Sequence, residues 1–222
     1  MRYKVIQDFK NDYVELFPKY NFTLGKYQTR IELLLNFPHI TKIDILELLE
    51  VSALCYYCDF YLYGNKFESD ELFWEIPTPD NINIPNPTYI SEYIHIIGQL
   101  FLTGYIDFLC DWDDDCERTD YSTNLSYYKE DKYQAWIYFR DNFFYTKRFL
   151  RKYDDNYNEI IKASWDTPRC WSEYNILVVR TPKGTKYFNE ILSPRFYNKY
   201  KDLEVEIDEQ GNIIRWIGEI KR

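Results

Sequence analysis

The sequence is poor in the side chains that most often serve as general bases. Its 222 residues include only two histidines, His39 and His95. A nucleophile–histidine–carboxylate arrangement would need one of them, and no residue pattern marks a nucleophile on a strained turn. His39 follows a proline in a predicted turn and His95 falls within a predicted helix. We therefore expect structural or surface roles for both histidines, and non-enzymatic function is favoured over catalysis.

Long apolar runs are also missing. The longest apolar stretches, such as Ile94–Leu102, are far shorter than the roughly 20 residues that a membrane-spanning helix needs. The first ten residues are polar, and no apolar segment of the kind found in secretory signals follows them. We expect a cytoplasmic protein that does not interact with a membrane.

The five cysteines are odd in number, which argues against a complete disulfide framework. Cys55 and Cys58 have the spacing of half a zinc site, and Cys110 and Cys116 could supply the other half. Neither pair has a histidine nearby, and Cys55 and Cys58 have apolar neighbours. Reduced thiols that pack as small apolar side chains are favoured, and no cofactor is expected.

The chain is rich in aromatic and apolar side chains. Aromatic residues make up 20% and hydrophobic residues 45% of the sequence, which excludes a disordered chain. The length suits a single domain over residues 1–222, with a possible division into a helical part, 1–87, and an α+β part, 88–222. Asparagine, isoleucine, lysine and tyrosine are frequent and alanine is rare, as expected for a low-GC bacterium or its phage.

Helical patterns dominate the first two-thirds of the chain. Thr41 and Asp44 form a capping-box pattern at the start of one helix. A short apolar pattern over Arg30–Phe37 precedes it. The proline-rich stretch Phe73–Pro87 is predicted to be a loop or linker. Two further helices are predicted, one from Thr88 to a stop at Gly104 and one over residues 131–152.

Strand patterns are concentrated in the last third. They cover Tyr174–Val179 and a hairpin of Leu203–Ile207 with Ile213–Ile220, and a helix is predicted after Pro182. A strand over Tyr105–Leu109 is also predicted. The fold class is therefore α+β, with a helical N-terminal two-thirds and a small antiparallel sheet formed mainly by the C-terminal third.

Charge is distributed unevenly along the chain. The formal net charge is −9, but residues 61–125 alone carry 13 acidic and 2 basic side chains. Seven carboxylates fall within residues 107–120, which we call the acidic segment. They are Asp107, Asp111, Asp113, Asp114, Asp115, Glu117 and Asp120. Their mutual repulsion favours contact with solvent, a metal or a basic partner.

A calcium loop does not fit the acidic segment. If the loop began at Asp111, Cys116 would take the position that requires glycine, and Ser122 the position of the bidentate glutamate. Two interpretations remain besides a solvated segment with no role. The carboxylates bind a basic surface on a partner protein, or they are neutralised by this chain's own C-terminal part, where residues 126–222 carry a net charge of +3.

The cationic side of helix 131–152 is the candidate nucleic-acid surface. Arg140, Lys147, Arg148, Arg151 and Lys152 line it, but aspartates such as Asp131 and Asp141 lie among them. Pairing of this side with the acidic part of the chain is favoured. Direct nucleic-acid binding is not expected.

The C-terminal residues Asp208 and Glu219-Ile220-Lys221 resemble the Asp…Glu-x-Lys signature of the PD-(D/E)xK nuclease superfamily. The resemblance covers residues 208–222 only. It implies that Asp208 and Glu219 hold Mg²⁺ on adjacent strands and that Lys221 orients the attacking water. Asp208, however, falls in the predicted hairpin turn.

Three functions follow from these patterns. The favoured one is a binding protein that blocks a partner with a basic surface, such as an immunity protein or a phage or host inhibitor of a nucleic-acid enzyme. The alternatives are a metal-dependent nuclease centred on Asp208, Glu219 and Lys221, and a structural or accessory protein of a mobile element. The oligomeric state stays open.

Overall fold

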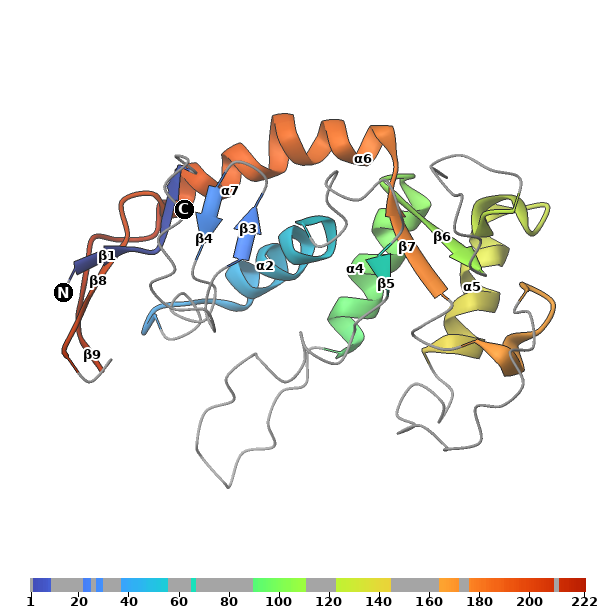
Figure 1. Cartoon of the computed structure of the whole chain (residues 1–222), viewed down its shortest axis with the longest axis horizontal. Helices are drawn as coiled ribbons and strands as arrows, with labels where there is room; N and C mark the ends of the chain where they lie inside the picture. Colours follow the sequence, from blue (N-terminus) through green and yellow to red (C-terminus); the bar gives the residue numbers. More distant parts are fainter. Residues whose placement is uncertain are drawn as a thin grey trace, which may run out of the picture. The chain divides into compact units, whose positions relative to one another are not determined.

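The computed structural model divides the chain into two compact units, each built from segments far apart in the sequence (Figure 1). Unit 1 comprises residues 1–55, 72–89 and 186–222, and unit 2 comprises residues 56–71 and 90–185. The residues that the structure describes are 2–8, 22–24, 27–29, 37–55, 65–66, 90–110, 123–144, 164–171, 176–209 and 212–222.

Unit 1 contains two small antiparallel sheets. The first, sheet A, has the order β1-β8-β9, with Tyr3 opposite Val205 and Val205 opposite Trp216. Its strands are β1 (Arg2–Lys4), β8 (Glu204–Ile207) and β9 (Ile213–Ile217). The second sheet has the order β2-β4-β3. Its strands are β2 (Ile6–Asp8), β3 (Phe22–Leu24) and β4 (Tyr27–Thr29).

Helix α2 (Lys42–Cys55) begins at the capping box that the sequence predicts. The backbone N–H of Thr41 donates to Asp44 Oδ2 at 2.7 Å, and the N–H of Asp44 faces Thr41 Oγ1 at 3.4 Å. Both bonds satisfy donors that the first turn of a helix would otherwise leave unpaired. The helix buries Leu48, Leu49 and Val51 in the core of unit 1.

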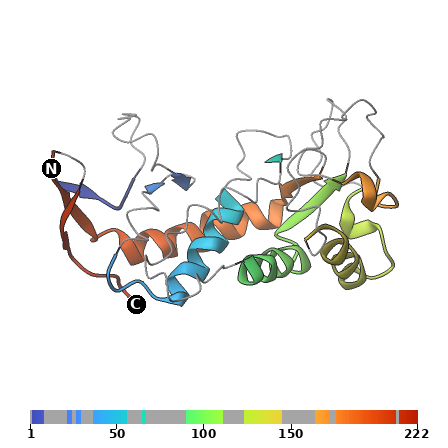
Figure 2. The same cartoon turned by 90° about the horizontal axis from the view of Figure 1, so that it is seen from below.

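A helical run over residues 182–200 changes its winding in the middle. It consists of α6 (Pro182–Tyr187), the π-helix η3 (Phe188–Leu192) and α7 (Ser193–Tyr200). Pro194 explains the wider turns, because it has no N–H to donate and its ring would clash with the carbonyl of Glu190 in a regular helix. Helix α2 contacts both η3 and α7, and it lies beside this helical run in Figures 1 and 2.

Unit 2 is built on a three-stranded antiparallel sheet of order β5-β7-β6. Its strands are β5 (Asn65–Lys66), β6 (Ile106–Cys110) and β7 (Ile176–Arg180), and every residue of β7 is buried. Helices α4 (Ile90–Leu102) and α5 (Lys132–Phe143) pack on each other, and α4 also contacts β6. The short 3₁₀ helices η1 (Leu125–Tyr127) and η2 (Pro168–Cys170) complete its described elements.

Two glycines determine how α4 ends and packs. Gly104 has a φ of 78°, a conformation that side-chain-bearing residues rarely adopt, and it turns the chain from α4 into β6. At Gly98, the ring of Trp136 from α5 occupies the space of a side chain. A Cβ at this position would lie 2.6 Å from the ring carbons Cε2 and Cζ2.

The core of unit 2 is an aromatic cluster. Phe139 lies at its centre, with its ring centroid 4.6 Å from that of Phe108 and 5.9 Å from that of Trp165. Trp136 and Trp171 are also buried in this cluster. Buried indole N–H groups need acceptors, and Trp165 Nε1 donates to the carbonyl of Thr123 at 2.7 Å.

The α+β class agrees with this architecture. The predicted helix starts and stops at Thr41 and Gly104 are confirmed, as is the C-terminal hairpin. The helical character of the first two-thirds stays a prediction, because Arg30–Phe37 lies almost wholly outside the described residues. The predicted loop Phe73–Pro87 also lies outside them.

The N-terminal strands were not predicted from the sequence. Residues 186–222 cluster with the N-terminal part of the chain, and the possible division at residue 87 stays a prediction. Whether the chain folds as one domain stays a prediction. Within the described residues, no helix combines the length and apolar character needed to cross a bilayer.

Candidate functional site

Asp107, the first carboxylate of the acidic segment, lies on β6 and is only 6% exposed. Its Oδ1 accepts hydrogen bonds from the N–H of Phe108 at 2.8 Å and from the N–H of Ser126 at 3.2 Å. Its Oδ2 accepts from the Ser126 hydroxyl and lies 3.5 Å from Asn124 Nδ2. Asp107 therefore ties β6 to η1, across the acidic segment.

This contact joins the two described stretches of chain that come before and after residues 111–122. The chain ends β6 at Cys110 and is held again at Asn124 and Ser126, beside Asp107. The other six predicted partner-binding residues lie outside the described residues, and their role stays a prediction. They are Asp111, Asp113, Asp114, Asp115, Glu117 and Asp120. Asp107 itself is buried, and its predicted partner-binding role stays a prediction.

The environment of Asp107 is electrostatically unusual. Burial raises the pKa of its carboxyl above the ordinary value, although the bonds from Ser126 and Phe108 act in the opposite direction. Burial also lowers the pKa of the Lys132 ammonium, which lies 4.7 Å from the centroid of the Phe101 ring. Oδ1 of Asn124 is buried and has no hydrogen-bond partner in the part of the chain that is described.

Residues 123–128, which follow the acidic segment, are held by the aromatic cluster. Trp165 binds the carbonyl of Thr123 through its indole N–H, and the carbonyl of Trp165 accepts from the Tyr138 hydroxyl at 3.2 Å. The Tyr128 hydroxyl donates to Asp166 at 2.7 Å. Burial, together with the bond to Asp166, raises the pKa of Tyr128 well above its ordinary value. Residues 123–128 are therefore fixed to the core of unit 2.

The two units differ in charge. Unit 2 carries 20 acidic and 13 basic side chains, a net charge of −7, while unit 1 carries 16 and 14, a net charge of −2. Most of the negative charge of the protein therefore belongs to the unit that holds the acidic segment.

The structure does not bring together the three residues of the nuclease resemblance. Asp208 lies at the turn of the β8–β9 hairpin and accepts from the N–H and the side-chain amide of Asn212, at 2.7 and 2.9 Å. Glu219 lies beyond the other end of the hairpin, two residues after Ile217, which is opposite Glu204.

The spacing along the hairpin excludes a shared metal ion. Four residues of strand separate Asp208 from Glu204, or about 13 Å, whereas two ligands of one Mg²⁺ lie about 2 Å from the ion. Lys221 forms an ion pair with Asp202 instead. Among the described residues, no group of three or more histidine, cysteine, aspartate or glutamate side chains could hold a metal ion.

The histidines and the described cysteine have ordinary surroundings. His39 is exposed in the turn before α2, with its ring 5.7 Å from that of Phe37, and His95 is exposed on α4. Cys110 is a half-buried cysteine at the end of β6. The side chains of Cys55, Cys58, Cys116 and Cys170 lie outside the described set.

The cationic side of helix 131–152 is described only in its first half. Helix α5 begins with Asp131 as its N-cap, whose carboxylate accepts from the N–H of Tyr133 at 2.6 Å. Arg140 forms an ion pair with the neighbouring Asp141 at 2.7 Å. Its predicted continuation from Lys147 to Lys152 lies in residues that the structure does not describe.

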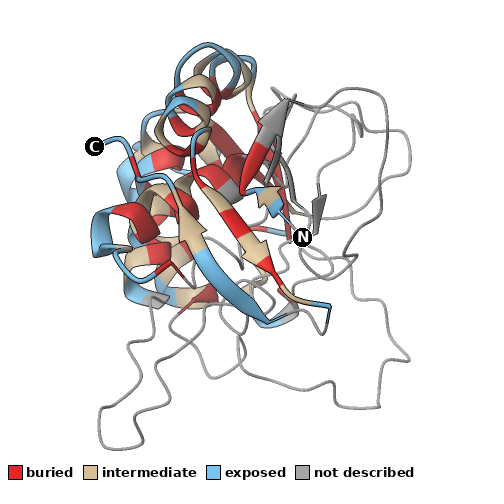
Figure 3. Cartoon of the chain, turned by 90° about the vertical axis from the view of Figure 1, so that its left-hand side faces the viewer, coloured by how far each residue is buried: buried red, intermediate tan, exposed pale blue. Residues whose placement is uncertain are grey.

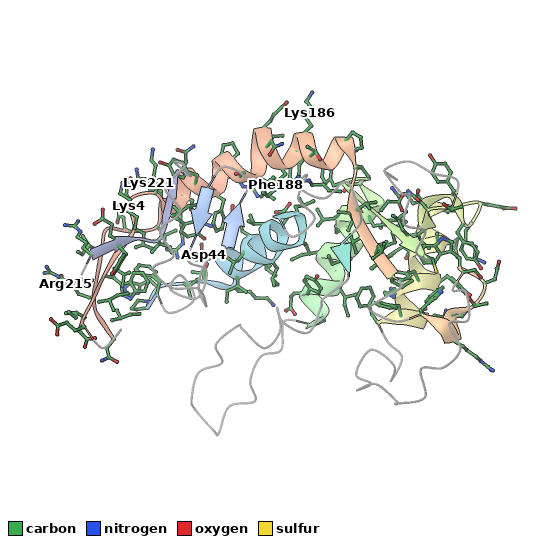
Figure 4. All side chains as sticks on the ribbon, viewed as in Figure 1. Lys4, Asp44, Lys186, Phe188, Arg215 and Lys221 are labelled. Atoms are coloured by element: carbon green, nitrogen blue, oxygen red, sulfur yellow. The ribbon has the colours of Figure 1, made fainter. Side chains whose placement is uncertain are left out.

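Sequence reasoning missed an ion-pair network in unit 1. Asp44, labelled in Figure 4 at the beginning of α2, is 1% exposed. It accepts from Lys199 Nζ and from Arg222 Nη2, both at 2.8 Å. Lys199 also contacts Glu47 at 2.5 Å, and Arg195 donates to Glu47 at 3.0 Å. The network joins α2, α7 and the C-terminal residues.

A signal for this network is present in the sequence. Asp44, Glu47 and Glu50 follow one another at intervals of three along α2, and Arg195 and Lys199 are four apart on α7. Both spacings place side chains on one face of a helix. The sequence could not show that these two faces meet.

The network determines the ionisation of Asp44. Burial opposes its negative charge, but the bonds from Arg222, Lys199 and Thr41 outweigh burial and hold the pKa of Asp44 well below its ordinary value. In the pairs Arg195–Glu47 and Arg222–Asp44 the cation is exposed and the carboxylate is largely buried. Arg195 is 50% exposed against 10% for Glu47, and Arg222 is 48% exposed against 1% for Asp44.

Comparison with known proteins gives no relative for this chain. No family model, no curated protein and no solved structure matches it.

Proposed function

We propose that this protein is a non-enzymatic binding protein that blocks a partner with a basic surface. The carboxylates at residues 111–120 of the acidic segment would make the contact. The observation that carries the proposal is the anchoring of both ends of this segment. Asp107 on one side and residues 124–126 on the other are bound to each other in unit 2. A segment held in this way loses less conformational freedom on binding than a free tail.

The charge distribution supports the same proposal. A dense group of carboxylates raises the rate at which a basic surface is encountered and selects against acidic partners. Enzymes that bind nucleic acids have basic clefts, because they bind phosphate through lysine and arginine. An acidic segment placed in such a cleft would compete with phosphate for the same cations. A bacterial immunity protein or a phage or host inhibitor would act in this way.

The test compares two variants with equal net charge. In the first, Asp111, Asp113, Asp114 and Asp115 are replaced by Asn. In the matched control, four exposed glutamates outside the acidic segment, Glu130, Glu190, Glu209 and Glu219, are replaced by Gln. The partner is first captured at low salt on immobilised wild-type protein and identified, and its association rate is then measured against salt concentration for all three proteins.

We expect the Asn variant to associate about tenfold more slowly than the wild type and with a flatter salt dependence, within the range known for electrostatic steering. The Gln control should resemble the wild type. If the two variants slow association equally, the association rate depends on net charge and the acidic segment is not the binding site. If neither slows it, the proposal is wrong.

A further inference from the structure

Among the described residues, strand β9 is an outer strand of sheet A. The sheet has the order β1-β8-β9, and in the described part of the chain β9 pairs with β8 alone (Figures 1 and 3). The pairing is regular from Arg215 to Ile217, and a bulge lies next to Ile214. The outer edge of these three residues therefore presents backbone N–H and C=O groups that another strand could bind.

The side chains of β9 do little to protect this edge. Natural proteins usually guard an edge strand with prolines or several charges. Strand β9 has no proline and a single charge, Arg215. Ile214 is 58% exposed and Ile213 is 36% exposed, so two large apolar side chains lie beside the edge.

Charges of opposite sign alternate from strand to strand on the outer face of sheet A. The register places Arg2 and Lys4 of β1 opposite Glu206 and Glu204 of β8, and Arg215 of β9 opposite Glu206. Val205 and Ile207 point to the opposite, buried face. The order across the three strands is therefore positive, negative, positive (Figure 4 labels Lys4 and Arg215).

Arg215 can bind a second carboxylate. Its Nε donates to Glu206 at 2.6 Å, yet its side chain stays 68% exposed. A guanidinium group has five N–H donors, and a carboxylate on a strand beyond β9 would lie opposite this side chain. The alternation of charge thus selects an acidic strand as the next neighbour.

We propose that β9 is a docking edge for an extended acidic segment of a partner protein. The segment adds to sheet A as a fourth strand. It places a carboxylate against Arg215, and apolar side chains against Ile213 and Ile214. This site lies in unit 1 and is independent of the acidic segment in unit 2, so the proposal goes beyond the blocking function. A second copy of β9 fits less well, because pairing centred on Arg215 would oppose two like charges.

The test uses two fluorescein-labelled peptides, Thr-Val-Glu-Val-Glu-Val-Thr and its counterpart with lysine in place of both glutamates. Fluorescence anisotropy measures their binding to the full chain. We expect the acidic peptide to bind at least about tenfold more tightly than the basic one. Arg215→Glu should reverse this preference. Amides of residues 213–217 should gain protection from hydrogen exchange when the acidic peptide binds.

A matched pair of variants controls for loss of folding. Ile214→Lys adds a bulky charge beside the edge and should abolish binding. Ile43→Lys makes the same change at an isoleucine that is 73% exposed on α2, away from the sheet, and should leave binding unchanged. The variant with four Asn substitutions in the acidic segment should also bind the peptide normally, which separates this site from the blocking function.

Three results would overturn the proposal. One is equal affinity for the two peptides. Another is binding that survives both Ile214→Lys and Arg215→Glu. The third is a dimer, detected by sedimentation, that Ile214→Lys dissociates, because the edge would then belong to a second copy of this chain.

Discussion

The ion-pair network of unit 1 gives the sharpest prediction about stability, through the substitution Asp44→Asn. The change keeps the size of the side chain and removes its negative charge. Lys199 Nζ and Arg222 Nη2 each lose a charged acceptor at 2.8 Å. The amide oxygen of asparagine can still accept one bond from Thr41, so the helix cap is partly preserved.

The expected loss of stability follows from these contacts. A hydrogen bond to a charged group is worth about 1.5–3 kcal/mol, and removing one partner of a buried ion pair costs about 3–5 kcal/mol. The upper value does not apply here, because Lys199 keeps Glu47 at 2.5 Å and Arg222 is 48% exposed. We therefore expect Asp44→Asn to lower the free energy of unfolding by about 2–3 kcal/mol.

Urea unfolding followed by circular dichroism measures this loss, which corresponds to a midpoint shift of about 1–2 M for a typical slope. Hydrogen exchange should show faster opening of α2 and α7, and so assign the loss to unit 1. The control is Asp202→Asn, which removes the exposed pair with Lys221, where both side chains are 53% exposed, and should leave the midpoint unchanged. Equal effects of the two substitutions would refute the reasoning.

Further predictions concern pH, packing and metal. Because folding lowers the pKa of Asp44 from its ordinary 3.8, its contribution is complete above that pH and is lost as the pH falls below it, so the stability of wild type should fall more than that of Asp44→Asn between pH 5 and pH 2. Gly98→Ala should destabilise unit 2 by about 1–2 kcal/mol in thermal unfolding, since Trp136 is held by surrounding rings and the clash outweighs the better helix propensity of alanine. Protein with Mg²⁺ should cleave neither plasmid DNA nor RNA; cleavage that Glu219→Ala abolishes would show that the separation of Asp208 and Glu219 along the hairpin was misjudged.

Local sequence patterns predicted local structure well in this chain. The capping box at Thr41, the glycine at 104 and the alternation in the C-terminal hairpin depend on near neighbours. Strand β1 was missed because its three residues show no apolar alternation, and β1 forms by pairing with β8 about 200 residues later. Contacts of this range leave no local mark in a single sequence.

Long-range contacts also limited what the sequence could predict about the candidate site. Composition alone identifies the acidic segment, but it could not separate Asp107 from the carboxylates that follow. Asp107 differs because it follows Ile106 within an apolar strand and can reach Ser126 and Asn124. The nuclease resemblance has a related limit, since its spacing was compatible with a hairpin but did not say at which end each carboxylate would lie.

The main alternative to the proposed function is that cations of this chain neutralise the acidic segment. The structure reduces the number of cations that could do so. Five of the C-terminal cations that could neutralise the acidic segment bind other carboxylates instead. Arg195, Lys199 and Arg222 bind carboxylates of α2, Arg215 binds Glu206, and Lys221 binds Asp202.

Three described cations of unit 2 are also engaged. Arg140 pairs with Asp141, Lys183 Nζ donates to the carbonyl of Thr103 at 2.6 Å, and Lys129 lies over the Tyr128 and Tyr138 rings. The cations within residues 147–162 lie outside the described residues and can be tested directly for the rival explanation. Replacing them with glutamine should speed association with a basic partner if they screen the acidic segment. It should leave the rate unchanged if the segment already faces outward.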